Sequence, residues 1–99
     1  MCGATAGGPS VEGIDVTKEA VIQGIVTRGE QPVGGAYVRL LDRTGEFTAE
    51  VPTSATGQFR FFAAPGPWTV RTLAPGASVD RQVVAEQGAV AEVEVALPV

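Results

Sequence analysis

Cys2 is the residue whose chemistry stands out, because it is the one cysteine in a chain of 99 residues. It lies in the segment MCGATAGGPS, whose small residues and proline predict a tail and not a packed element. Cysteine in second position permits removal of the initiator methionine, and Cys2 would then carry both a thiol and a free α-amine. A nearby ammonium group favours the thiolate, which is the nucleophilic form of cysteine. Cys2 is therefore the candidate reactive residue, and the competing interpretation is an incidental residue of the tail.

The residue types that are missing narrow the possible chemistry further. The chain contains neither histidine nor asparagine. It therefore lacks the usual general base near neutral pH and cannot build a Ser-His-Asp or Cys-His pair. One cysteine without histidine also excludes a conventional zinc site. The sequence favours a non-enzymatic protein and predicts neither a metal nor another cofactor.

Charge and hydropathy restrict the partners and the compartment. The net charge is −4, and the six arginines are scattered among acidic residues, so we expect no nucleic-acid partner. No apolar run approaches the length of a membrane helix, and no charged segment followed by an apolar stretch precedes Cys2. A single cysteine cannot form an internal disulfide, which is typical of a reducing compartment. We therefore expect a soluble cytoplasmic protein without a membrane partner.

The aromatic residues offer a second candidate site. They alternate with polar residues in the predicted strands: Phe47, Phe59, Phe61, Phe62 and Trp68. Aromatic side chains line ligand pockets, but in a thin sandwich we expect these rings to form the core. Phe62 is the exception, because the alternation that turns Phe61 inward turns Phe62 outward beside Arg60. We therefore expect Arg60 and Phe62 to form an exposed partner-binding patch.

Seven short strands must position these side chains. Runs of β-branched and aromatic residues between Gly- and Pro-bearing turns predict strands near 20–28, 36–43, 46–53, 58–64, 68–73, 81–86 and 90–97. Pro65 and Gly66 suit the central positions of a type II turn, which predicts a hairpin between two of the strands. No segment has the 3.6-residue period of a helix. The sequence predicts one antiparallel β-sandwich domain over residues 19–99, preceded by a flexible tail over residues 1–18. Pairing of its edge strands between copies would give a homodimer.

Three motifs carry a resemblance to a known fold. Residues 24–74 resemble a carboxypeptidase-regulatory-like, prealbumin-like sandwich. The motifs are the Pro-Val-x-Gly-Ala loop at 31–36, the Thr-to-Gly-x-Phe turn at 53–59, and the Pro-Gly-aromatic-Thr segment at 65–69. This resemblance implies the fold, and modules of this kind serve many roles.

A narrower resemblance points to sulfur metabolism. The segments AYVRLLD, EFTAEV and SATGQFRFFAAPGPWT, with the opening MC, are similar to the actinobacterial SseC-type proteins, a family carried as a domain of unknown function. The resemblance implies a cytoplasmic accessory protein that partners a rhodanese-type thiosulfate sulfurtransferase. Cys2 is its candidate acceptor of sulfane sulfur, by its position in the matching MC. The alternative is a structural adaptor of the carboxypeptidase-regulatory-like type without sulfur chemistry.

Two further arrangements have simpler explanations. Adhesin relatives of this sandwich form an isopeptide bond from a strand lysine, but here Lys18 is the one lysine and Asp80 is a poor substitute for asparagine. The acid pairs at 46/50 and 92/94 have same-face spacing, as a glycosidase dyad can have. We expect them to lie on solvated strand faces.

Overall fold

Alternating apolar and polar residues form nine β-strands in the part of the chain that the structure, a computed structural model, describes, namely residues 4–7 and 20–98. The strands are β1 (Ala4–Gly7), β2 (Ala20–Arg28), β3 (Gln31–Pro32), β4 (Tyr37–Leu41), β5 (Phe47–Pro52), β6 (Gln58–Ala63), β7 (Gly66–Ala74), β8 (Ala77–Ala85) and β9 (Val90–Leu97). These residues include no helix, and so none that could cross a membrane.

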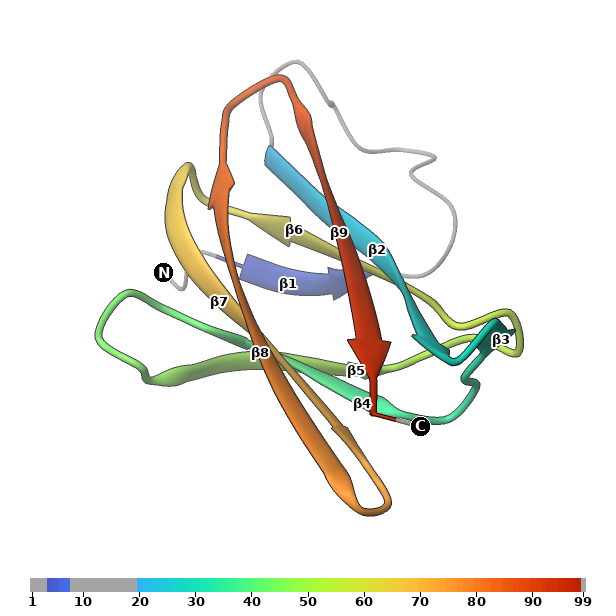
Figure 1. Cartoon of the computed structure of the whole chain (residues 1–99). Helices are drawn as coiled ribbons and strands as arrows, with labels where there is room; N and C mark the ends of the chain where they lie inside the picture. Colours follow the sequence, from blue (N-terminus) through green and yellow to red (C-terminus); the bar gives the residue numbers. More distant parts are fainter. Residues whose placement is uncertain (1–3, 8–19, 99) are drawn as a thin grey trace.

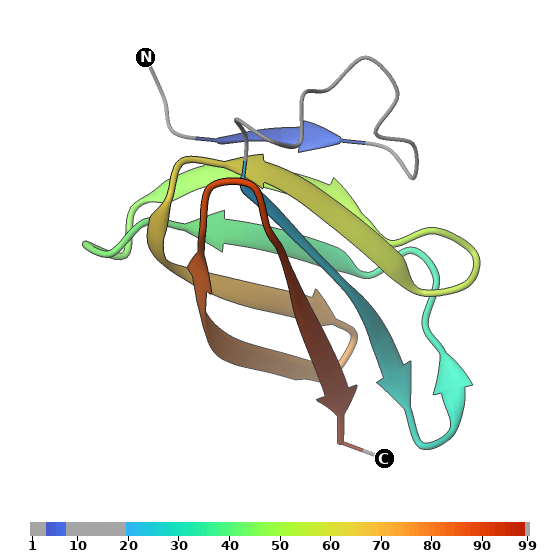
Figure 2. The same ribbon diagram turned by 90° about the horizontal axis from the view of Figure 1, so that it is seen from above.

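The strands form two sheets, which Figures 1 and 2 show from two directions. Sheet A has β2 at its centre, with β9 along one side and β6, then β1, along the other. The short strand β3 pairs with the end of β2, beyond β6. Sheet B has the order β5-β4-β7-β8. The predicted two-sheet β-sandwich is confirmed.

Apolar side chains from both sheets fill the space between them. The alternation places Ile22 and Phe61 of sheet A, and Leu40 and Val70 of sheet B, in one fully buried cluster. Since successive side chains of a strand point to opposite faces, the neighbours of these residues point away from the other sheet. The outer faces therefore carry the polar residues.

Gly24 lets the central strands of sheet A approach closely. A Cβ atom at this position would collide with the backbone oxygen of Val93 in β9 and would lie 2.8 Å from the ring of Phe59 in β6. A residue with any side chain would push these strands apart, so only glycine suits the position.

Two expectations about strand pairing were wrong. The ladder between β2 and β9 is parallel, although every other ladder between described strands is antiparallel. The turn at Pro65 and Gly66 does not close a hairpin, because it leads from β6 in sheet A to β7 in sheet B. Local turn chemistry reverses the chain, but contacts between distant strands decide which strands pair.

The face of Phe47 was also predicted wrongly. A register shift lies between Leu40 and Leu41, so that Leu40 pairs with Ala49 while Leu41 pairs with Phe47. The extra residue in β5 moves Phe47 to the outer face, where its side chain is 59% exposed. A β-bulge therefore removes this ring from the expected core.

The predicted N-terminal tail contains one described strand. Residues of β1 pair antiparallel with β6, from Ala4 opposite Ala63 to Gly7 opposite Arg60. Residues 1–3 and 8–19 of the predicted tail lie outside the described residues.

Candidate functional site

Phe62 does not form an exposed patch with Arg60, and this expectation was wrong. Alternation gave its face correctly, because Phe62 is absent from the cluster between the sheets that holds Phe61. The ring is nevertheless only 8% exposed. Strand β1 makes β6 an internal strand, with Thr5 on one side of Phe62 and the buried Val21 on the other. Residues on the two neighbouring strands can therefore bury a side chain that points to the outer face of a sheet.

Arg60 belongs instead to a polar row across sheet A. Arg60, Gln23 and Glu92 lie opposite one another on β6, β2 and β9. The Arg60 guanidinium donates to the Gln23 side-chain oxygen at 2.9 Å, and the Gln23 amide donates to the Glu92 carboxylate at 2.8 Å. The amide thereby connects a cation on β6 to an anion on β9. Gln23 was not identified as a site residue from the sequence. The one indication in the sequence was its polar side chain at an outward-facing position of an otherwise apolar strand.

The next row on the same face is less polar. Gln58, Ile25 and Glu94 lie opposite one another on the same three strands. Ile25 is partly exposed at the centre of this row. The two rows together give a surface with a cation at one side, two carboxylates at the other and an apolar side chain between them.

A groove of about 870 Å³ lies along these rows. Its walls come from both rows and from the end of β5 with the loop after it: Gln23, Ile25, Arg60, Glu92, Glu94 and residues 51–54. A concave surface that combines apolar and polar side chains is the usual form of a binding site. This groove is the candidate binding site.

Thr53 fixes the wall of the groove to the neighbouring loop. Its side-chain oxygen donates to the Val33 carbonyl at 2.6 Å and accepts the Ala36 N–H at 3.0 Å. Its backbone N–H donates to the Ala36 carbonyl, and its carbonyl accepts the Gly35 N–H. Loop 33–36 and the segment leading from β5 to β6 are therefore held as one unit.

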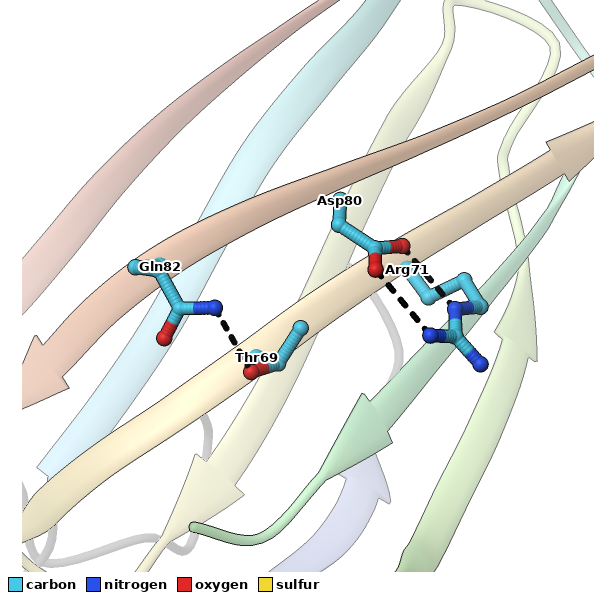
Figure 3. A network of polar contacts seen from close by, with 4 residues as sticks. All are labelled: Thr69, Arg71, Asp80 and Gln82. Atoms are coloured by element: carbon cyan, nitrogen blue, oxygen red, sulfur yellow. Dashed lines mark hydrogen bonds and ion pairs between the residues drawn. The ribbon is translucent and has the colours of Figure 1, made fainter. Parts of the chain in front are cut away.

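The outer face of sheet B carries a row of four charges. Glu50, Arg39, Arg71 and Asp80 lie opposite one another across β5, β4, β7 and β8. Arg39 forms an ion pair with Glu50 at 2.6 Å and lies 5.8 Å from the centre of the exposed Phe47 ring. Arg71 donates two hydrogen bonds to the Asp80 carboxylate, at 2.9 and 3.0 Å, as Figure 3 shows.

The contact between Arg71 and Asp80 shifts the pKa values of both groups. The hydrogen bonds and the charge of Arg71 lower the pKa of Asp80, and the hydrogen bond and charge of Asp80 raise the pKa of Arg71. Beside this pair, the Gln82 amide donates to the Thr69 hydroxyl at 3.0 Å (Figure 3). A carboxylate held in its charged form by an exposed arginine is a surface ion pair and not a poised acid or base.

The other residues singled out in the sequence form no second site with one another in the described chain. Cys2 and Lys18 lie outside the described residues. Phe59, Phe61 and Trp68 are buried, as expected for the core. Glu46, Glu50, Glu92 and Glu94 are exposed, as expected for solvated faces. Residues 4–7 and 20–98 contain no group of three or more His, Cys, Asp or Glu that could hold a metal ion.

Several solved structures share this fold. The minor pilin GBS52 of Streptococcus agalactiae superposes with a TM-score of 0.68 at 12% identity, covering 84% of this chain and 45% of the pilin. The major pilin BcpA of Bacillus cereus gives 0.68 at 21% identity, covering 81% and 29%. A dioxygenase domain from Streptomyces sp. SirexAA-E gives 0.64 at 15% identity, covering 96% and 94%. The chain spans less than half of either pilin, and at these identities the likeness establishes the fold alone.

Relatives in sequence come from mycobacteria. An uncharacterized protein of Mycolicibacterium smegmatis is 55% identical over 84 residues, which cover 84% of this chain and 93% of the relative. Two uncharacterized proteins of Mycobacterium tuberculosis H37Rv are each 54% identical over 83 residues, covering 83% of both chains. Residues 2–97 match the model described as "Protein of unknown function (DUF1416)". The chain therefore belongs to the DUF1416 family.

Proposed function

We propose that this protein is a non-enzymatic accessory protein of sulfur metabolism, of the SseC type, that accepts sulfane sulfur on Cys2 from a rhodanese-type thiosulfate sulfurtransferase. The residue inventory supports this role, because Cys2 is the one thiol of a chain without histidine. The perturbed carboxyl groups Asp42 and Asp80 are held in their charged forms by exposed neighbours, so neither is suited to acid–base work.

The observation that carries the proposal is the anchoring of β1. Ala4, two residues after Cys2, pairs with Ala63 at the margin of sheet A. Cys2 therefore lies just before a strand whose pairing with β6 is described, and we place the proposed sulfur transfer near the Ala63 end of β6. The donor enzyme would have to dock beside that end.

The transfer needs no oxidant. The Cys2 thiolate attacks the outer sulfur of the partner's cysteine persulfide, a new S–S bond forms at Cys2, and the partner's S–S bond breaks with its electron pair remaining on the partner's thiolate. The proton of the persulfide stays on the transferred sulfur. A reducing compartment keeps the acceptor Cys2 as a free thiol, so we place this role in the cytoplasm.

Mass spectrometry tests the proposal directly. The protein is incubated with thiosulfate and the sulfurtransferase, free thiols are blocked by alkylation, and the N-terminal peptide is analysed. We expect one added sulfur atom on Cys2 and none in a Cys2→Ser variant. Absence of added sulfur on Cys2 contradicts the carrier role. If Cys2→Ser fully supports sulfurtransferase flux, the protein acts as an adaptor whose thiol has no part.

A further inference from the structure

Strand β9 has one free edge. β2 pairs with one side of β9, and among the described strands none pairs with the other side. The Val93 carbonyl points toward β2, since it is the atom that a Cβ at Gly24 would strike. The Glu94 carbonyl points the other way and accepts a hydrogen bond from the Arg81 guanidinium at 3.2 Å. Because successive residues of such a strand alternate between its two sides, Glu92, Glu94 and Ala96 present their backbone groups to the free edge.

Two hollows meet at this edge. The groove of about 870 Å³ borders β9 on the outer face of sheet A. A second hollow of about 280 Å³ separates β9 from residues 80–83 of β8. Both are lined by Glu92, Val93 and Glu94. At Glu92, Val93 and Glu94 the edge is therefore bordered by two hollows, although β8 lies beside β9 along part of its length. An unpaired strand edge beside such hollows is the geometry that accepts an added strand.

The negative charge of Glu92 and Glu94 at this edge indicates what kind of strand it would bind. Glu92 and Glu94 are two residues apart and so point to the same outer face. The Glu92 carboxylate is bonded to Gln23, whereas the Glu94 carboxylate has no hydrogen-bond or ion-pair partner in the described chain. Opposite charges on neighbouring strands stabilise their pairing. A strand with basic side chains at every second position therefore matches this edge.

We propose that the free edge of β9 binds an extended basic segment of a partner protein as an added strand, with lysine or arginine side chains beside Glu92 and Glu94. A second copy of this chain is a poorer occupant, because two β9 strands paired about a two-fold axis would bring the glutamates of both copies together. This binding site does not involve Cys2 and stands independently of the sulfur-transfer role.

Arg81 has a definite place in this interaction. Its guanidinium occupies the Glu94 carbonyl, which an incoming strand needs as an acceptor. A charged side chain at this seam also discourages unspecific edge pairing. Arg81 therefore competes with the incoming strand, and its removal will strengthen binding.

Fluorescence anisotropy with labelled, capped peptides tests the proposal on the full chain. The probe alternates lysine with threonine. A second peptide has glutamate in place of lysine, and two others carry N-methyl groups on alternate backbone amides, one set in each register. We expect saturable binding of the lysine peptide, none of the glutamate peptide, and loss of binding for at least one N-methylated peptide. Glu94→Gln weakens binding about fivefold, and Arg81→Ala tightens it.

The matched control is Glu50→Gln, which removes the same charge from the outer face of sheet B and leaves the affinity unchanged. The proposal is overturned by no saturable binding at millimolar peptide, by binding of both N-methylated peptides as tightly as the unmodified lysine peptide, or by equal effects of Glu50→Gln and Glu94→Gln. It is also overturned if sedimentation shows a dimer that the lysine peptide cannot dissociate, because a second copy then occupies the edge. Circular dichroism melting shows that each variant is folded.

Discussion

The Thr53 hydroxyl donates a 2.6 Å hydrogen bond to the backbone carbonyl oxygen of Val33, 20 positions earlier in the chain. The Thr53 hydroxyl oxygen also accepts a hydrogen bond from the backbone N–H of Ala36. The buried Thr53 side chain therefore provides hydrogen-bond partners for two backbone groups of loop 33–36, which lies outside the β-strands. It also connects this loop to the wall of the groove.

Thr53→Val will lower the free energy of unfolding by about 1–3 kcal/mol, because it leaves two backbone groups of the loop without their partner while preserving the shape of the side chain. Urea unfolding followed by circular dichroism measures the change. Thr53→Ser, which keeps the hydroxyl, will be much closer to the original protein. Equal stability of the valine variant would show that water replaces both hydrogen bonds.

Thr72→Val will stabilise the protein by about 1 kcal/mol. Thr72 is 0% exposed, and its hydroxyl has no hydrogen-bond partner among residues 4–7 and 20–98. Valine has nearly the same shape without the unsatisfied group. Thermal unfolding is the measurement, and Thr72→Ser is the control that keeps the hydroxyl and loses the methyl group. A lower melting temperature for the valine variant would mean that the hydroxyl is satisfied in solution.

Phe62→Ser and Phe47→Ser will have very different effects. Phe62 is 8% exposed, so its loss will cost about 3 kcal/mol. Phe47 is 59% exposed and contacts Arg39 from the surface, so its loss will cost less than about 1 kcal/mol. Chemical denaturation of the two variants side by side checks the contrast. Similar losses would contradict the assignment of Phe62 to a covered face.

Asp42→Asn will reduce the loss of stability in acid. Hydrogen bonds from the Thr44 side chain and the Glu46 backbone lower the pKa of Asp42 below 3.8. Since the unfolded chain takes up this proton at higher pH than the native chain, the stabilisation is fully present above that value and is lost as the pH falls through the lower native pKa.

Asparagine keeps the acceptor oxygen but does not titrate, so the variant isolates this contribution. Urea midpoints measured near neutral pH and near about pH 3 give the comparison. The native protein will lose more stability between the two conditions than Asp42→Asn does. An equal loss in both proteins would mean that Asp42 titrates alike in the native and unfolded chains.

The sequence predicted the strands better than their partners. The bounds of β2 and β9 were anticipated at both ends, because alternation of apolar residues is a local property. That these two strands lie side by side and parallel depends on contacts between residues some 70 positions apart, which no local pattern contains. The turn at Pro65 and Gly66 was recognised as a turn but not as a passage between sheets.

The candidate site was only partly predictable for the same reason. Arg60 was singled out correctly as an outer-face residue, but its connection to Glu92 through Gln23 requires the order of three strands. The prediction that Phe62 lies on the outer face was correct, but the prediction that it is exposed was wrong. Alternation gives the face of a side chain and does not show which residues cover it. The register shift that exposes Phe47 comes from one extra residue in β5 relative to β4. No sequence pattern marks this extra residue before the pairing of the two strands is known.

The row from Glu50 to Asp80 across sheet B cancels its own charge, since two arginines lie between two acids. It therefore contributes no net monopole at long range. The orientation of an approaching charged partner will be set by the outer face of sheet A, where Glu94 has no counterion among the described residues. Increasing ionic strength should then slow the encounter with a basic partner at β9 while leaving association through sheet B nearly unaffected.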